Sequence, residues 1–239
     1  MKQAGLIFCC LFLLGISCEK NDASNASPVT MEYGFESGDE GWIVGFSDYP
    51  AGLSLSDSLV LYQLSYGWSK LPASVTPAQS GIRISGINRS DDLFMYIKRK
   101  ITGLLPDTEY KMDFEVDLAS SAPTNAVGIG GPPGEAVVLK VGASAKEPLN
   151  VRDALQHYRL NIDKGNQSVG GADMAVIGHV GVSDTTTVHA IIRRRTTTSL
   201  VKRSSVNGEL WLITGTDSGF EGKTELWWAR VKVVLQPLG

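Results

Sequence analysis

Acidic and histidine side chains are the residues of this 239-residue chain whose types could support acid–base or metal chemistry. Two carboxylates that meet in a fold could supply the acid and base of a glycoside hydrolase, but a sequence does not show their separation. The alternative is that they are solvated loop acids and turn caps. The carboxylates that adjoin Gly- or Pro-containing loops are Asp48, Glu135, Glu147 and Asp163.

Motifs of nucleophilic, metal and nucleotide chemistry are absent from the sequence. There is no G-x-S-x-G, P-loop or H-E-x-x-H pattern, and residues 128–134 lack the last Gly of G-x-G-x-x-G. His157, His179 and His189 have no short spacing that would place two of them on one face of an element. We therefore predict no catalytic residue and no cofactor, and we favour a non-enzymatic function over an enzymatic one.

Aromatic side chains are the stronger candidates for ligand contact, because a flat ring can stack on the apolar face of a sugar. Tyr62, Tyr66 and Trp68 lie close together beside Gly67, in a segment that we expect to be a loop. Trp227 and Trp228 are adjacent on an expected strand, so they point to opposite faces and only one can enter the core. We predict these five aromatic residues as ligand-binding candidates, with core packing as the alternative.

A basic stretch comprises Arg193, Arg194 and Arg195, followed by Lys202 and Arg203. It is typical of a charged face or edge strand that discourages sheet aggregation, with a sulfated or uronic polysaccharide partner as the alternative. The net charge of the whole chain is -3, so we expect no nucleic-acid partner.

The three cysteines, Cys9, Cys10 and Cys18, all lie in the first eighteen residues. Residues 1–17 contain Lys2, an apolar run over residues 4–14 and then small residues, as in an export signal. That run is too short for a spanning helix, which needs about 20 residues. Cleavage before Cys18 would leave one cysteine, which excludes a disulfide framework and a thiolate metal site.

Residues 14–18, with the sequence LGISC, resemble a bacterial lipoprotein signal in which the cysteine is diacylated. Gly15 departs from the usual Leu at its position. The resemblance implies signal residues 1–17, a lipid anchor such as palmitate on Cys18, and a location in the bacterial cell envelope. Residues 18–30 are polar and Ser/Asn-rich, as in a flexible tether. The charged cluster directly after Cys18, residues 19–22, resembles signals that route some Bacteroidetes lipoproteins to the cell surface, with a solvated spacer as the alternative.

Alternation with a period of two dominates residues 31–239, which we predict to form one domain. Over residues 109–118 the apolar side chains share one face and the charged side chains the other. Other expected strands are residues 93–101, 136–141, 157–162, 174–180, 189–196, 209–214 and 224–235.

About ten to twelve strands, with Gly- and Pro-rich turns and little helix, predict an all-β sandwich of the jelly-roll type. We expect Asn207-Gly208 to form a type I′ hairpin between its flanking segments. Residues 151–158 are the stretch where a short helical turn is expected.

The ends of this domain resemble galactose-binding-like jelly rolls, which include many carbohydrate-binding modules. The resemblance rests on Tyr33-Gly34-Phe35-Glu36 with Gly41-Trp42, and on the closing segment 222–228. It implies a structural calcium ion, for which Glu36 matches the acidic residue of the opening strand. The closing strand departs from that pattern, because it lacks the usual Asp. Three further segments, residues 130–144, 163–167 and 215–222, resemble uncharacterised bacterial lipoproteins, and that resemblance implies no activity.

The leading hypothesis is a membrane-anchored extracytoplasmic protein that binds a glycan. The alternatives are an envelope lipoprotein with a structural or interaction role and no small ligand, and a glycan hydrolase or lyase with acidic catalytic residues.

Overall fold

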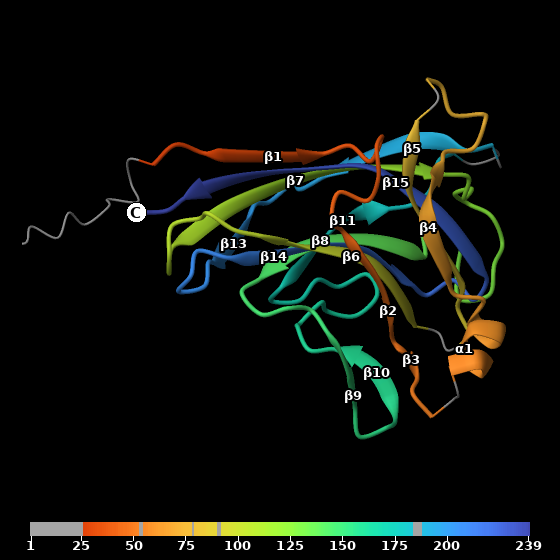
Figure 1. Ribbon diagram of the computed structural model, residues 1–239. Helices are drawn as coiled ribbons and strands as arrows, with labels where there is room; N and C mark the ends of the chain where they lie inside the picture. The colour runs from red at the N-terminus through yellow and green to blue at the C-terminus, as the bar shows by residue number, and fades with distance from the viewer. Residues whose placement is uncertain (1–25, 53–54, 78, 90–91, 184–187) are drawn as a thin grey trace, which may run out of the picture.

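The computed structural model describes residues 26–52, 55–77, 79–89, 92–183 and 188–239. Within these residues the chain forms an all-β sandwich of two antiparallel sheets (Figure 1). The expected signal peptide, Cys18 and most of the expected tether lie outside the described residues. The first strand begins at Val29, so Val29 and Thr30 are paired in a sheet.

Sheet A has seven strands and sheet B has five, in line with the predicted number. Sheet A contains β1 (Val29–Tyr33), β4 (Ser65–Lys70), β5 (Ser80–Ile87), β7 (Glu109–Ser120), β12 (Ala190–Arg195), β13 (Leu200–Arg203) and β15 (Lys223–Pro237). Sheet B contains β2 (Ile43–Ser47), β6 (Leu93–Ile101), β8 (Val137–Ser144), β11 (Met174–His179) and β14 (Leu210–Ser218). A small third sheet contains β3 (Tyr49–Pro50), β9 (Asn150–Arg152) and β10 (His157–Leu160).

The chain crosses repeatedly between the two large sheets. Strand β5 of sheet A leads to β6 of sheet B, then to β7 of sheet A and β8 of sheet B. The same alternation carries β13, β14 and β15 between the sheets. These crossings are those of a jelly roll, so the predicted fold class is confirmed.

The core lies between sheets A and B and follows the predicted alternation. In β7 the side chains of Met112, Phe114, Val116 and Leu118 are all buried. In β15 a β-bulge between Trp228 and Arg230 shifts the register against β7. Because successive side chains alternate, this extra residue lets Trp228 and Val231 both point into the core.

Three local predictions were wrong. The segment of Tyr66 and Trp68, which we expected to be a loop, contains strand β4 and pairs with β5. Residues 151–158 contain parts of β9 and β10 rather than a helical turn, and the observed helix is α1 (Leu55–Tyr62). Gly208 does form a tight turn with a φ of 67°, and its amide donates to Ser205 O. The flanking strands do not pair as a hairpin, because β13 joins β7 in sheet A whereas β14 joins β6 and β8 in sheet B.

The small sheet lies against the outer face of sheet B (Figure 1). Together with residues 161–173 it covers Phe94, Tyr96 and Ile213, which form a second apolar cluster with Ile162 and Met174. Sheet B is therefore buried on both faces, and every residue of β8 is buried. This cover also forms the wall of the larger polar cavity described below.

Trp228 tests how much the core contributes to stability. Its side chain is fully buried, and we expect Trp228→Ala to lower the free energy of unfolding by about 3–5 kcal/mol through the cavity that it leaves. Urea unfolding followed by circular dichroism measures this loss. Trp68→Ala is the matched control, because the Trp68 side chain is half-exposed. Equal losses for the two variants would contradict the assignment of Trp228 to the core.

Candidate functional site

A groove with aromatic walls lies where an edge of sheet A faces an edge of sheet B. Strand β4 is the last strand of sheet A, and β2 is the last strand of sheet B. Their side chains enclose a cavity of about 280 Å³. We call it the aromatic groove. It is lined by Asp39, Trp42, Ile43, Val44, Tyr66, Gly67, Trp68 and Ile82.

Tyr66 and Trp68 alternate with Gly67 along β4, so their rings lie on the same face of the strand. Tyr66 is 63% exposed and Trp68 is 49% exposed. The indole Nε1 of Trp68 donates to Phe35 O at 2.7 Å, and the Tyr66 ring packs against Phe46 with centroids 6.3 Å apart. The two rings are therefore held in position while much of their surface remains open to solvent.

The other three predicted aromatic residues are buried and present no free ring face. Trp228 packs in the core, and Tyr62, at the end of α1, packs against Tyr49. Trp227 points to the opposite side of β15, as alternation requires, but the segment containing Leu71 and Val75 covers it. Of the five candidates, only Tyr66 and Trp68 have the exposure that stacking on a ligand needs.

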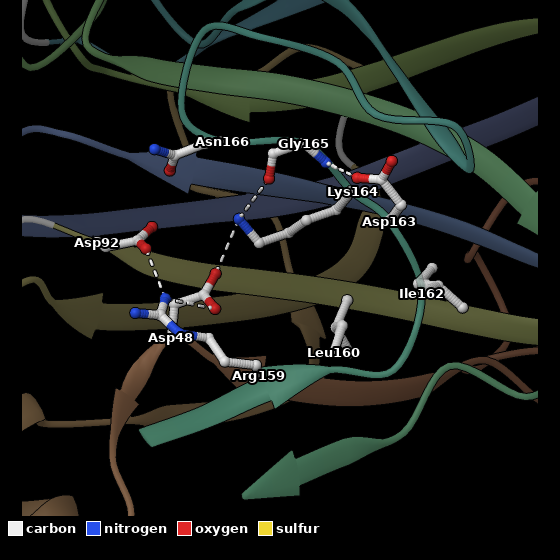
Figure 2. Close-up of a pocket in the computed structure, with 9 residues that line it drawn as sticks. All are labelled: Asp48, Asp92, Arg159, Leu160, Ile162, Asp163, Lys164, Gly165 and Asn166. Carbon is white, nitrogen blue, oxygen red and sulfur yellow. Dashed lines mark hydrogen bonds and ion pairs between the residues drawn. The ribbon is translucent and has the colours of Figure 1, made fainter. Parts of the chain in front are cut away.

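A second cavity, of about 350 Å³, lies on the outer side of sheet B and is lined mainly by charged residues. We call it the charged pocket. It is lined by Asp48, Asp92, Arg159, Leu160, Ile162, Asp163, Lys164, Gly165 and Asn166 (Figure 2). Arg159 Nη1 donates to Asp48 Oδ1 at 2.9 Å and to Asp92 Oδ2 at 2.6 Å. Arg159 thereby ties the small sheet to two segments of the sandwich.

Below this pocket a carboxylate and two lysines are buried. Asp217 Oδ2 lies 2.8 Å from Lys140 Nζ and 2.7 Å from Lys164 Nζ. Lys164 Nζ also lies 2.9 Å from Asp48 Oδ2. We call Asp48, Asp92, Asp217, Lys140, Lys164 and Arg159 the buried charge cluster. Its three acidic and three basic side chains balance in formal charge.

Burial raises the pKa of an acid in this cluster and lowers the pKa of a lysine, because it disfavours the charged form of each. Burial, with repulsion from Asp48 and Asp217, raises the pKa of Asp92 to about 7, although Lys164 and Arg159 oppose the shift. Burial also lowers the pKa of Lys140, against the attraction of Asp217. For Lys164 burial alone would lower the pKa, but attraction to Asp217 and Asp48 outweighs it and the pKa is raised.

Oxygen atoms of Asp48, Asp92 and Asp217 lie within 4.8 Å of one another, which is the spacing of a metal site. The lysine ammonium groups already take the position of a cation there, so we assign no metal to this cluster. Glu36, the calcium candidate, is exposed and is not part of this group of acidic residues. The calcium site stays a prediction.

Of the four loop carboxylates, Asp48 and Asp163 both line the charged pocket, whereas Glu135 is exposed and does not line it. Asp48 meets Asp92, whereas Glu147 pairs with Lys98 at 2.7 Å and Asp163 accepts the amides of Gly165 and Ala172. Asp48 is almost wholly covered and is held by Arg159 and Lys164, so it presents little oxygen surface to a substrate.

The sequence analysis did not identify Asp92, Lys140 and Asp217 as site residues. Lys140 gave a signal in the sequence, because a charged residue inside the apolar run of residues 136–141 indicates a buried charge that needs a partner.

The basic stretch lies on strands β12 and β13, which pair with β7 at the margin of sheet A. Arg193 donates to both oxygens of Asp117, at 2.7 and 2.9 Å, and Arg194 donates to His179 O at 3.0 Å. These arginine side chains are thus engaged within the domain, as expected of a charged edge.

Comparisons with known proteins give structural similarity only. No protein-family description and no curated sequence matches the chain. A carbohydrate-binding module solved with β-1,4-galactotriose is similar, with 10% identity, a TM-score of 0.37, and 84% of this chain and 92% of that one covered.

A carbohydrate-binding module studied for mannan recognition has 12% identity, a TM-score of 0.39, and coverage of 87% and 98%. A cyclase from Fischerella sp. TAU has 12% identity, a TM-score of 0.43, and coverage of 89% and 100%.

Asp163 tests how the wall of the charged pocket is held. Its backbone hydrogen bonds from Ala172 and Gly165 lower the pKa of the carboxyl, so its stabilising effect is present above the unfolded pKa of about 3.9 and is lost as the pH falls through the folded value. We expect Asp163→Asn to lower Tm by a few degrees at pH 7 and by less near pH 3. Glu135→Gln is the exposed control and should leave Tm unchanged. A pH-independent loss for Asp163→Asn would contradict the ionic contribution.

Proposed function

We propose that this protein is a lipid-anchored, extracytoplasmic binding domain that holds a glycan in the aromatic groove. The observation that carries this proposal is the pair of rings, Tyr66 and Trp68, fixed side by side with much of their surface exposed. In a domain with a hydrophobic core, large aromatic side chains normally bury most of their surface there. Two immobilised, half-open rings in a cavity therefore favour a ligand that stacks on them.

Preorganisation of the rings supports this function. The hydrogen bond from Trp68 Nε1 to Phe35 O fixes the plane of the indole before any ligand arrives. Tyr66 is supported from behind by Phe46 of β2. Because the side chains are already ordered, binding loses little additional rotamer entropy, and more of the contact energy remains as affinity.

The polar lining of the groove favours a neutral sugar. Asp39 is the only charged residue among the described residues that line it. Asp39 Oδ1 accepts the amide of Gly41 at 2.9 Å, and a carboxylate of this kind can accept hydrogen bonds from sugar hydroxyls. A uronic or sulfated chain would meet this negative charge without a compensating cation in the groove.

The proposed cellular location of the protein rests on its sequence rather than on the folded domain. We propose that Cys18 carries the lipid and that residues after it let the domain sample the space near a bacterial envelope membrane, in keeping with outer-membrane surface exposure. No helix in the described part of the chain is long and apolar enough to cross a membrane. Contact with the membrane would then be through the lipid, and the glycan would be the external partner.

Removal of the Trp68 ring tests the glycan site. We expect Trp68→Ala to weaken glycan binding about tenfold, because it removes a stacking surface worth about 1.4 kcal/mol. Tyr66→Ala should weaken binding less. The measurement is a glycan array followed by titration calorimetry on the strongest ligand.

Trp211→Ala is the matched control, because Trp211 packs near Lys98 and does not line the groove. It should bind as the wild type does. If the folded wild type binds no glycan on the array, the glycan proposal fails and the role of an envelope lipoprotein without a small ligand gains support. Release of sugar from a bound glycan would instead favour the hydrolase or lyase alternative.

The anchor has its own test. Cells that express the full chain are grown with a fatty-acid analogue that can be coupled to a dye. The wild type should incorporate the label and fractionate with membranes, whereas Cys18→Ala should do neither, because the acylated thiol is lost. Label uptake by Cys18→Ala would refute lipidation at this residue.

A further inference from the structure

We propose that Lys140 and Asp217 join in an amide bond, so that a covalent cross-link connects β8 and β14 inside the buried charge cluster. The two side chains lie diagonally across the paired strands, because Lys140 is opposite Gly215 in the register. Lys140 Nζ lies 2.8 Å from Asp217 Oδ2, and both side chains have 0% exposure. The nucleophile and the carboxyl are thus already in contact and shielded from water. This inference is independent of the glycan site.

The two lysines on Asp217 differ in a way that assigns each a role. Burial lowers the pKa of Lys140, which favours the neutral amine that attacks a carboxyl carbon. The pKa of Lys164 is raised, so Lys164 keeps its charge. Its Nζ lies 2.7 Å from Asp217 Oδ2, where it can stabilise the negative charge that develops on that oxygen during attack.

The other oxygen of Asp217 supplies the leaving group. Asp217 Oδ1 is buried and has no hydrogen-bond partner among the described residues. A buried acceptor without a partner is costly in a permanent ion pair, but amide formation removes this atom as water. Asp92, whose carboxyl oxygen lies within 4.8 Å of one on Asp217, has a pKa raised to about 7 and can therefore carry a proton at neutral pH.

The reaction balances without an oxidant or a cofactor. The nitrogen lone pair of Lys140 forms the bond to Cγ of Asp217, and the bond from Cγ to Oδ1 breaks. Of the three protons of the Lys140 ammonium group, one stays on nitrogen and two leave with Oδ1 as water. Ionised Asp92 first takes one proton from the ammonium group, which frees the lone pair for attack, and delivers it to Oδ1. It then takes the second proton from the nitrogen that has attacked and passes it to the same oxygen, which leaves as water. The charged pocket, about 350 Å³ in volume, adjoins the cluster and can receive the water.

Burial supplies a driving force for this condensation. An ion pair withdrawn from water loses the hydration of both ions, and its conversion to a neutral amide removes both charges. The product also has partners in place. Its N–H can donate to Lys164 O or Val169 O, each now 3.0 Å from Lys140 Nζ, and its carbonyl oxygen can keep the contact with Lys164.

The experiment is peptide mapping of the purified full chain by mass spectrometry after denaturation and trypsin digestion. The expected result is a branched peptide in which the Lys140 and Asp217 segments are joined, with a mass lower by one water than the sum of the two. Trypsin should not cleave after the modified Lys140. Wild-type protein with a folded circular dichroism spectrum and only separate, unmodified peptides would overturn the proposal.

Three variants make the assignment specific. Lys140→Arg keeps a cation against Asp217 but cannot form this amide, and it should show no branched peptide. Asp92→Asn should accumulate the branched peptide roughly a hundredfold more slowly after refolding, and an unchanged rate would refute Asp92 as the proton carrier. Lys98→Arg is the matched control, since Lys98 is a buried lysine paired with Glu147, and it should cross-link as the wild type does. A mass loss of one water that persists in Lys140→Arg would overturn the cross-link between these residues.

Discussion

The apolar layer between sheets A and B is the constraint on which the rest of the structure depends. The strands of both sheets have to keep their apolar side chains inward, and a slip of one residue would turn those side chains to the outer face of the sheet. The bulge in β15 shows the strength of this demand, because it preserves the inward orientation of both Trp228 and Val231. Once this register is set, it also fixes which side chains point outward. The exposed rings of the aromatic groove and the charged side chains below the charged pocket are at such positions.

The aromatic groove is a consequence of how the sandwich ends. Sheets A and B stop at β4 and β2, and the core between them has to be closed at that margin. Tyr66 and Trp68 close it with large rings that pack inward on one side and remain open on the other. A feature that protects the core therefore also presents a platform, with Asp39 as its polar partner.

The buried charge cluster arises in another way, because it forms where the outer face of sheet B is covered by other segments of the chain. Sheet B is buried on its outer face by the small sheet and by residues 161–173, so Lys140 and Asp217 cannot reach solvent. Charges in such a place need partners or neutralisation. Arg159 and Lys164 provide partners, and the amide between Lys140 and Asp217 that we propose would provide neutralisation.

The sequence by itself determined what depends on local pattern. Alternation identified β7 and the β-sandwich that such strands imply, because the charged side chains at the start of β7 are exposed or partly exposed and the apolar ones between them are buried. The expected leader and the lipidation of Cys18 also rest on local pattern, and they stay predictions. Local pattern could not show that β13 and β14 pair in different sheets across the Asn207-Gly208 turn, or that a neighbouring segment covers Trp227.

Only the tertiary structure brought Asp92, Lys140 and Asp217 together, because contacts between residues far apart in the chain depend on the packing of whole sheets and leave no spacing in the sequence.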